Sequence, residues 1–514
     1  MLIRTLGAKC VGIDAALVTV ETHIDKGIGI HLVGLADVAV KESLLRTTTA
    51  LQAIGYHIPG KRIVINLAPA DVHKNGSGYD LPIAVGIIAA SEQCDLPLAG
   101  RFLLMGELGL DGSVRDVPGG LAVAELVGRE GLDGIVLPLN SAQEAAELHG
   151  TRVFGVDNLE DVVRILSGQE DCSEFLARPA PPDSDKASDI PDFRDIIGQA
   201  GVKRGMEIAA AGAHNVCMIG PPGSGKSSLA KALSGILPPM TREESLVTSK
   251  IFSIAGKGSL RHGLMDRRPF RAPHYSASLP AIVGGGAGDN IMPGEVSLAQ
   301  NGVLFLDEAA QMPRGVIEAL RGPMEDRKVV ISRLKTKVEY PASFMLVLAS
   351  NPCPCGYWGV GDRCTCTPAQ RLSYLSRLSG PLMDRIDLQL LVPGLPPADL
   401  ARIKAEGHAE ESSAEVARRV EAARDIQKRR FAGEGIFTNA EMSNKHIERF
   451  CGLSEECSKL LISLMDHLGL SMRAYFRIIK VARTIADLEA CPDILPRHIS
   501  EAASYRFLDR MPAY

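Results

Sequence analysis

Short apolar runs alternate with amphipathic segments in the first part of the chain, a pattern that predicts strands and helices in one domain. The elements expected within residues 1–175 are the strands Val11–Glu21, Gly29–Val33 and Arg62–Leu67, and the helices Ala36–Ile54 and Leu81–Ala90. The second helix is apolar on every side, which indicates a buried position. An α/β or α+β domain is therefore expected.

Strand and helix signals alternate again between residues 192 and 393, whereas residues 394–514 show mainly helical periodicity. The buried strands expected in the middle region are His214–Ile219, Val303–Leu306, Ser343–Ala349 and Asp387–Val392. The last region is expected to be an all-helical lid. Residues 176–191 are rich in Pro, Ser and Asp, which predicts an exposed linker between the first two regions.

Composition places the 514 residues among ordinary globular proteins, with 46% hydrophobic and 23% charged residues. The longest apolar stretch, Leu81–Ala90, is too short to span a bilayer. Arg4, Lys9 and Asp14 make the first twenty residues unlike a signal peptide. We therefore expect a cytoplasmic location and no membrane partner. The net charge of −5 means that any nucleic-acid surface must be local.

A phosphate-binding loop is predicted between the strand His214–Ile219 and a helix at Gly225–Gly235. Its glycines allow backbone N–H groups to surround phosphates, Lys226 supplies a positive charge, and the Ser227 hydroxyl is a ligand for Mg²⁺. A chance Gly-rich turn is the alternative interpretation. The residues expected to bind ATP are Gly220, Pro221, Pro222, Gly223, Ser224, Gly225, Lys226, Ser227 and Ser228.

Polar side chains follow two further apolar strands. Asp307 and Glu308 come directly after Val303–Leu306, at the end of a strand where open α/β sheets bind ligands. Asp307 is expected to hold Mg²⁺ and Glu308 to polarise the attacking water. Asn351 follows the strand Ser343–Ala349 and could reach the same water or the γ-phosphate. An acidic helix start and an Asn-Pro turn are the ordinary alternatives.

Two arginines are candidates for sensing or completing a nucleotide site. Arg385 lies between Asp384 and Asp387 just before a strand, and is either locally paired or an arginine finger that reaches a neighbour's ATP. Arg473 lies at the start of a helix in the lid and could contact the γ-phosphate. By itself it is indistinguishable from a surface arginine.

The order of these motifs resembles the AAA+ ATPases related to the small subunit of magnesium chelatase, and most closely the bacterial ComM/YifB group. The motifs that carry the resemblance are His31–Ala36, Lys41–Ser43, Asn66–Asp71, Ile197–Gln199, the phosphate loop, Phe270–His274, Pro293–Glu295, Asp307–Glu308, Asn351–Cys355, Ser379–Asp387 and Ala482–Ala486. They span essentially the whole chain. Gln300 and Ala309–Met312 depart from the usual pattern of the family.

This resemblance implies an AAA+ P-loop core with a parallel sheet, and hexameric rings. Asn351 becomes sensor 1, Arg473 becomes sensor 2, and Arg385 becomes the finger. ComM-like members are implicated in ATP-driven branch migration of DNA during recombination in natural transformation, so a helicase or translocase acting with recombination proteins is expected. The competing hypothesis is a protein-remodelling ATPase of the chelatase or chaperone type.

DNA is expected to contact basic insertions of the core. One lies within residues 250–275, and the other is a predicted hairpin over Val329–Val338. Lysines and arginines at such positions would neutralise phosphates without reading sequence. A solvated basic face is the alternative. The candidate DNA-binding residues are Arg268, Arg271, Lys328, Arg333, Lys335 and Lys337.

Four cysteines cluster as two Cys-x-Cys pairs separated by eight residues: Cys353, Cys355, Cys364 and Cys366. Four thiolates suit tetrahedral zinc, although the one-residue gaps are tighter than usual. Labile disulfides, or no ligand, remain the alternatives. The position between Asn351 and Arg385 favours a structural clip over a catalytic role.

The N-terminal region also resembles the catalytic fold of Lon protease, an S5-like α/β domain. Lys74–Gly78 resembles the nucleophile loop, and Gly106–Gly120 resembles the segment that carries the catalytic lysine. A Ser-Lys dyad needs that lysine as its base. No lysine occurs between Lys74 and Lys186, so we expect a scaffold or DNA-guiding role.

Overall fold

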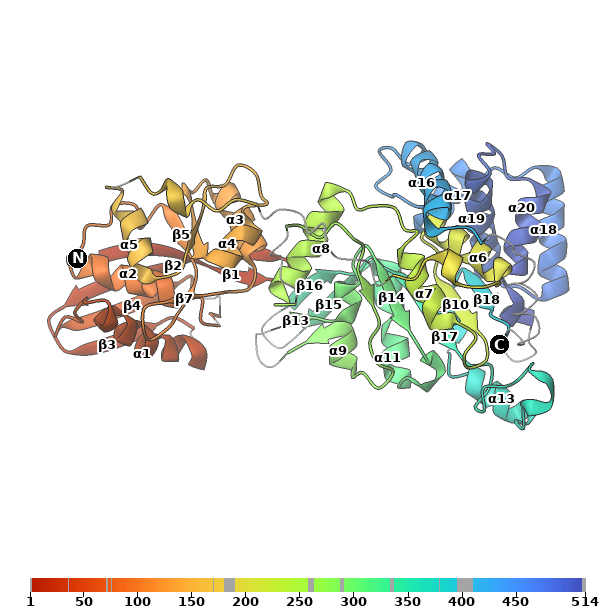
Figure 1. Ribbon diagram of the computed structural model, residues 1–514, viewed down its shortest axis with the longest axis horizontal. Helices are drawn as coiled ribbons and strands as arrows, with labels where there is room; N and C mark the ends of the chain where they lie inside the picture. The colour runs from red at the N-terminus through yellow and green to blue at the C-terminus, as the bar shows by residue number, and fades with distance from the viewer. Residues whose placement is uncertain are drawn as a thin grey trace.

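The computed structural model describes residues 2–35, 37–70, 73–74, 76–169, 171–179, 190–257, 263–286, 291–332, 337–378, 380–394 and 410–510. The N-terminal region, a central sheet and a C-terminal group of helices follow one another along the long axis of the molecule (Figure 1).

The N-terminal sheet consists of seven strands of the described chain in the order β3-β4-β2-β1-β5-β8-β9. Their bounds are β1 (Leu2–Val11), β2 (Asp14–Asp25), β3 (Gly29–Val33), β4 (Arg62–Ala68), β5 (Phe102–Leu104), β8 (Gly134–Pro138) and β9 (Val153–Val156). β2 is antiparallel to both β1 and β4, and the other neighbouring strands are parallel. A short ladder of β6 (Glu107–Leu108) and β7 (Val114–Arg115) lies beside the sheet.

Helices cover both faces of this sheet. Successive side chains of a strand point to opposite faces, so one strand contributes apolar residues to two clusters. Phe102 packs in one apolar cluster and Leu103 in the other. The helices of the first cluster are α1 (Val38–Ala53), α2 (Asp80–Ala90) and α5 (Leu159–Ser167), and those of the second are α3 (Gly120–Glu130) and α4 (Leu139–Ala145). The other predicted strands and helices of this region are confirmed to within a few residues, whereas the predicted strand Val11–Glu21 includes the turn between β1 and β2. Every residue of α2 is buried. The long strand β1 was not predicted.

The central sheet has five strands in the described chain, in the order β11-β14-β17-β10-β18, and every neighbouring pair is parallel. Their bounds are β10 (Val216–Ile219), β11 (Phe270–Arg271), β14 (Val303–Leu306), β17 (Met345–Ser350) and β18 (Leu388–Leu391). Met218 packs toward α6 (Ala200–Gly212) and α7 (Lys226–Ser234), whereas Cys217 faces the opposite cluster. Both faces are therefore buried, as the continuous apolar runs predict.

Further helices in the described part of the central region are α8 (Arg242–Ile254), α9 (Leu279–Val283), α10 (Glu295–Leu298), α11 (Arg314–Ala319), α12 (Arg321–Asp326), α13 (Pro368–Leu375) and α14 (Gly380–Met383). Two short ladders add β12 (Gly284–Gly285) with β13 (Met292–Pro293), and β15 (Lys328–Ser332) with β16 (Lys337–Pro341). The second ladder is the predicted hairpin.

The C-terminal region consists of helices that pack on the α6 face of the central sheet. They are α16 (Ser413–Arg430), α17 (Asn444–Phe450), α18 (Glu455–Leu468), α19 (Met472–Leu488) and α20 (Pro496–Ser504). The 3₁₀ helices in the described residues are Ser173–Phe175, Phe193–Asp195, Ala309–Gln311, Gly361–Arg363, Asn439–Glu441 and Phe507–Arg510. The α/β class, with its parallel sheet and helical C-terminal region, is thus confirmed.

Helix α8 joins the N-terminal region to the core. The buried Lys250 ammonium forms an ion pair with Glu125 on α3, and the Gly119 backbone N–H donates to Ser253 Oγ at 3.1 Å. These contacts fix the N-terminal region against the same core that carries the hairpin. Residues 180–189 of the predicted linker lie outside the described residues. Within the described ranges, no helix has the length and apolar character needed to cross a membrane.

A buried carboxylate organises the C-terminal helices. The Asp487 side chain is fully buried and accepts hydrogen bonds from Arg430 Nη1 at 2.8 Å, Arg483 Nε at 3.1 Å and Asn439 Nδ2 at 2.8 Å. One carboxylate therefore ties α16 and the Asn439–Glu441 turn to α19. Losing it would leave two guanidinium groups without their shared anion.

We expect Asp487→Asn to lower the free energy of unfolding by about 3–5 kcal/mol, because removal of one member of a buried ion pair leaves uncompensated charge. Asp493→Asn, at an exposed position six residues after Asp487, is the control. Urea unfolding followed by circular dichroism would measure both. Equal effects of the two substitutions would contradict this view of Asp487.

Candidate nucleotide-binding site

The predicted phosphate loop connects β10, which lies between β17 and β18 in the parallel sheet, to α7. Gly223 and Gly225 have φ angles of 75° and 89°, which favour glycine. Gly220 also needs glycine, because an added Cβ would lie 2.3 Å from the Val392 carbonyl oxygen. Gly225 is the N-cap of α7, so the start of that helix faces into the loop. The local geometry thus suits an anion.

The Lys226 ammonium lies inside this loop. Its Nζ donates to the carbonyl oxygens of Gly220 at 2.7 Å and Pro221 at 2.8 Å, and lies 3.4 Å from Asn351 Oδ1. Burial lowers its pKa, while the carboxylates of Asp307 and Glu308 act in the opposite direction. The structure therefore brings together Lys226 and Asn351, which are 125 positions apart.

The acidic pair meets the loop at the same edge of the sheet. Ser227 Oγ donates to Asp307 Oδ2 at 2.7 Å, and the Glu308 backbone N–H donates to Asp307 Oδ1 at 2.9 Å. Glu308 has a φ of 49°, a left-handed conformation that is uncommon outside glycine and frequent at functional sites. The hydroxyl and carboxylate oxygens form a donor set that suits Mg²⁺.

The two candidate arginines lie away from this edge. Arg385 precedes β18, whereas the phosphate loop follows the parallel neighbour β10, so the two occupy opposite ends of adjacent strands. Arg385 is largely buried, pairs with Glu325 and donates from Nη1 to the Pro381 carbonyl oxygen at 2.6 Å. The Arg473 side chain, 68% exposed, bonds Asp384 at 2.8 Å. Arg473 therefore lies with the predicted finger and not with the phosphate loop of its own chain.

Sequence reasoning missed Arg477, one helical turn after Arg473 on α19. Its Nε donates to the Asp384 carbonyl oxygen at 2.6 Å, and its guanidinium pairs with buried Asp387. Burial would raise the pKa of Asp387, but Arg477 and His214 hold that pKa well below its usual range. Arg477 thus anchors the segment on both sides of Arg385. The sequence signal that could have identified Arg477 is its spacing of four residues from Arg473, which places the two arginines on the same helix face.

Known protein families and relatives match the sequence over most of its length. Family models described as "Subunit ChlI of Mg-chelatase", "Magnesium chelatase, subunit ChlI" and "Magnesium chelatase, subunit ChlI C-terminal" match residues 20–141, 192–400 and 410–506. The chain is 44% identical over 501 residues to the uncharacterized protein YifB of Salmonella typhimurium, covering 97% of this chain and 96% of that protein. It is 43% identical over 504 residues to competence protein ComM of Haemophilus influenzae, covering 97% and 96%.

The chain belongs to the ComM/YifB family of magnesium-chelatase-like AAA+ ATPases. A more distant match, 25% identical over 339 residues, is DNA replication licensing factor mcm6 of Dictyostelium discoideum, which covers 60% of this chain and 34% of that protein.

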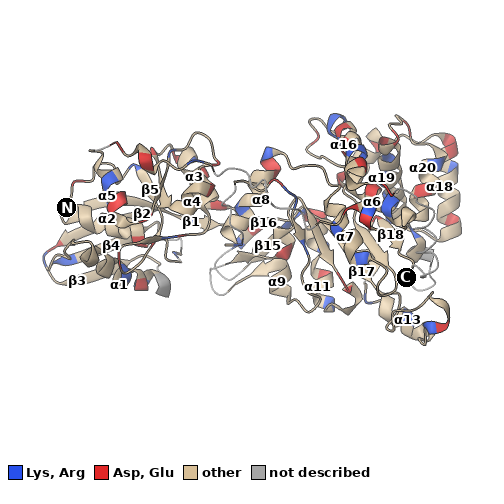
Figure 2. Cartoon of the chain, viewed as in Figure 1, with Lys and Arg blue, Asp and Glu red and all other residues tan. Residues whose placement is uncertain are grey.

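In this ComM/YifB member, Lys and Arg residues are interspersed with Asp and Glu residues along the molecule (Figure 2). Arg271 pairs with Glu295 through Nε at 2.6 Å, and Lys328 pairs with Glu339 at 3.0 Å. Lys328 and Lys337 are exposed on the β15–β16 hairpin. The predicted DNA-binding residues Arg333 and Lys335 lie outside the described residues.

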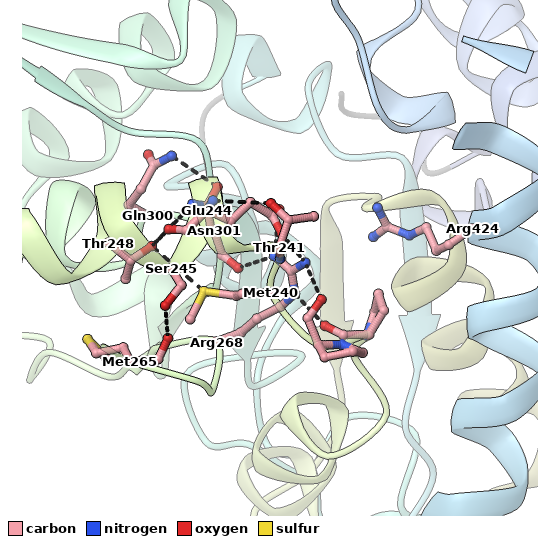
Figure 3. A network of polar contacts seen from close by, with 12 residues as sticks. Met240, Thr241, Glu244, Ser245, Thr248, Met265, Arg268, Gln300, Asn301 and Arg424 are labelled. Atoms are coloured by element: carbon pink, nitrogen blue, oxygen red, sulfur yellow. Dashed lines mark hydrogen bonds and ion pairs between the residues drawn. The ribbon is translucent and has the colours of Figure 1, made fainter. Parts of the chain in front are cut away.

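Arg268 lies in a partly buried network of polar contacts (Figure 3). Its guanidinium forms two hydrogen bonds with Glu244, at 3.0 and 2.8 Å. It also donates to the carbonyl oxygens of Pro238 at 2.7 Å and Asn301 at 2.8 Å. These contacts hold α8 to the amino end of β14, which favours a structural role for this arginine.

The four clustered cysteines converge beside the nucleotide site. The Sγ atom of Cys353 lies 3.3 Å from that of Cys355 and 3.8 Å from that of Cys364, and all four sulfur atoms lie within 4.8 Å of one another. Tetrahedral zinc with Zn–S bonds of about 2.3 Å needs sulfurs about 3.8 Å apart. Hydrogen bonding from the Tyr357 backbone lowers the pKa of Cys355 to about 6. The cluster therefore has the donor set of a structural zinc site.

The loop that resembles a protease nucleophile loop contains Ser77, whose hydroxyl donates to the Glu107 carboxylate. The ammonium group of Lys74 lies against the Pro69 carbonyl oxygen.

We expect Arg268→Gln to lower the free energy of unfolding by about 2 kcal/mol, since hydrogen bonds to charged groups contribute roughly 1.5–3 kcal/mol. Arg267→Gln, at the exposed neighbouring position, should change it by less than about 0.5 kcal/mol. Denaturant unfolding would compare the two. If both variants kept wild-type stability, Arg268 would be free to serve a ligand instead.

Proposed function

We propose that this chain hydrolyses ATP with Mg²⁺ and assembles into a homohexameric ring that moves along DNA. The proposed role is that of a helicase or branch-migration factor in recombination of imported strands. The observation that carries the proposal is the division of the site. Lys226, Ser227, Asp307 and Asn351 converge at one edge of the parallel sheet, and Arg385 lies at the other.

Within one subunit, Lys226 would hold the β- and γ-phosphates. Ser227 Oγ and Asp307 Oδ2 would hold Mg²⁺, which neutralises phosphate charge. The Glu308 carboxylate would accept a proton from the attacking water, and the Asn351 amide would orient that water. Because Glu308 follows Asp307 directly, one strand end positions both the metal ligand and the base.

Between subunits, Arg385 and Arg473 would complete the site of the neighbouring copy. Both lie on the face opposite the phosphate loop, and Asp384 and Arg477 hold them together. A guanidinium supplied in trans stabilises charge on the transferred phosphoryl group. A closed ring is the symmetric assembly in which every site receives such an arginine.

The DNA assignment is supported by the exposed lysines of the β15–β16 hairpin and by the names of two relatives. One relative is called a competence protein and the other a DNA replication licensing factor. Lys328 and Lys337 would contact phosphates, a mode of binding that is independent of sequence.

We also propose that Cys353, Cys355, Cys364 and Cys366 bind one zinc ion. The sulfur–sulfur distances support this. A closed set of four thiolates favours a structural ion over a catalytic one.

The central experiment is steady-state ATP hydrolysis by the purified protein, with and without single-stranded, duplex and branched DNA. Stimulation by DNA that falls steeply with salt is expected. Glu308→Gln should lower kcat by at least about 100-fold, the range for loss of a general base, and leave ATP binding intact. Glu243→Gln, at an exposed position on α8, is the control and should retain activity.

An ATPase rate that no DNA changes would contradict the proposed movement along DNA. It would favour a partner protein as the substrate that the ATPase remodels. Full activity of Glu308→Gln would overturn the assignment of the base.

A further inference from the structure

The cysteine cluster touches the phosphate loop directly. Gly356, next to Cys355, has a φ of 84°, and a Cβ added there would lie 2.8 Å from Pro222 Cγ and 3.8 Å from Asn351 Cγ. The backbone of the cysteine loop therefore lies against the ring of Pro222, one wall of the nucleotide site. No side chain larger than hydrogen fits between the two without a shift.

The turn that makes this contact carries two of the four thiols. The Gly356 backbone N–H donates to the Cys353 carbonyl oxygen at 2.9 Å, which closes a tight turn. Cys353 is fully buried and lies two residues after Asn351, at the end of β17. The first thiol pair thus belongs to the edge of the sheet where the nucleotide side chains meet.

The second thiol pair is held from the other side, by α13. Thr367 caps this helix directly after Cys366. Arg371 donates from Nε to the Cys366 carbonyl oxygen at 3.1 Å, and its guanidinium lies 5.4 Å from the centre of the Trp358 ring. An ion that joined all four sulfurs would therefore fasten the turn at Pro222 to the base of α13.

We propose that zinc in the cysteine loop controls ATP binding by holding Gly356 against Pro222 and so fixing the wall of the phosphate loop. The proposal rests on the ATP and zinc sites assigned above. Between the two thiol pairs the chain contains Gly356, Gly359 and Gly361, which gives it high conformational freedom unless it is cross-linked. Binding of zinc would restrict the conformations of this loop. Loss of the zinc ion would allow Gly356 to move away from Pro222.

Two glycines of this loop provide a matched pair of variants. Gly356 and Gly359 have φ angles of 84° and 85°, so alanine meets the same backbone strain at either position. An added Cβ at Gly356 meets Pro222, whereas at Gly359 it meets nothing within 4 Å. The two variants therefore differ in whether the added Cβ contacts the phosphate loop.

The test uses the full-length protein and measures zinc content by atomic absorption and ATP affinity with a fluorescent ATP analogue. Gly356→Ala should keep one zinc per chain and bind the analogue at least tenfold more weakly. Gly359→Ala should keep both properties within about twofold of wild type. Wild-type protein stripped of zinc by a chelator should lose affinity similarly and regain it with added zinc, and circular dichroism checks that each sample is folded.

Equal ATP affinity of the two alanine variants would overturn the proposal, as would tight ATP binding by folded, zinc-free wild type. Either result leaves the proposed ATPase intact. A zinc-loaded wild type that binds no ATP would instead refute the proposed function, and this inference with it.

Discussion

The parallel direction of the five central strands is the constraint on which the rest of this structure depends. Because every strand runs the same way, the segments after β10, β14 and β17 emerge at one edge, and these carry Lys226, Asp307 and Asn351. The segment before β18 must then lie at the other edge, with Arg385. In the proposed assembly, this separation would place Arg385 next to the ATP of a neighbouring copy.

The buried Asp387 carboxylate stabilises the end of the sheet where Arg385 lies. Asp387 accepts from the Asn215 backbone at 3.0 Å and pairs with Arg477 of the C-terminal helices. His214 lies 3.6 Å from the same carboxylate and shares a hydrogen bond of 2.8 Å with Thr484. The core and the C-terminal helices are therefore joined by polar contacts beside Arg385. Movement of the helices would be transmitted to Arg385, which is how a ring could couple one site to the next.

The sequence was most informative where local pattern decides structure. Apolar runs located β10, β14, β17 and β18 to within about two residues, and the polar residues after β10, β14 and β17 lie close together, as predicted. Strand β1 was missed because it carries a buried lysine, Lys9, among its apolar residues. Such a strand fits neither an alternating nor a continuous apolar pattern.

Charged side chains were harder to assign from sequence. Lys250 contributed to the predicted basic insertion, yet its partner is Glu125, and Arg268 is paired with Glu244. A pairing between residues far apart in the chain depends on tertiary packing, which a local charge count does not contain. The contact of Gly356 with Pro222 was hidden for the same reason, since the two residues are 134 positions apart.

The most direct measurement mixes two inactive variants. Subunits with Arg385→Ala keep the phosphate loop and Glu308, and subunits with Glu308→Gln keep the arginine, so a site shared between copies is restored only where the two kinds meet. If the site lies between subunits, an equal mixture should recover roughly a quarter of wild-type ATPase, the fraction of interfaces that pair two intact halves. A mixture no more active than its components, or an Arg385→Ala protein with full activity alone, would contradict the shared site.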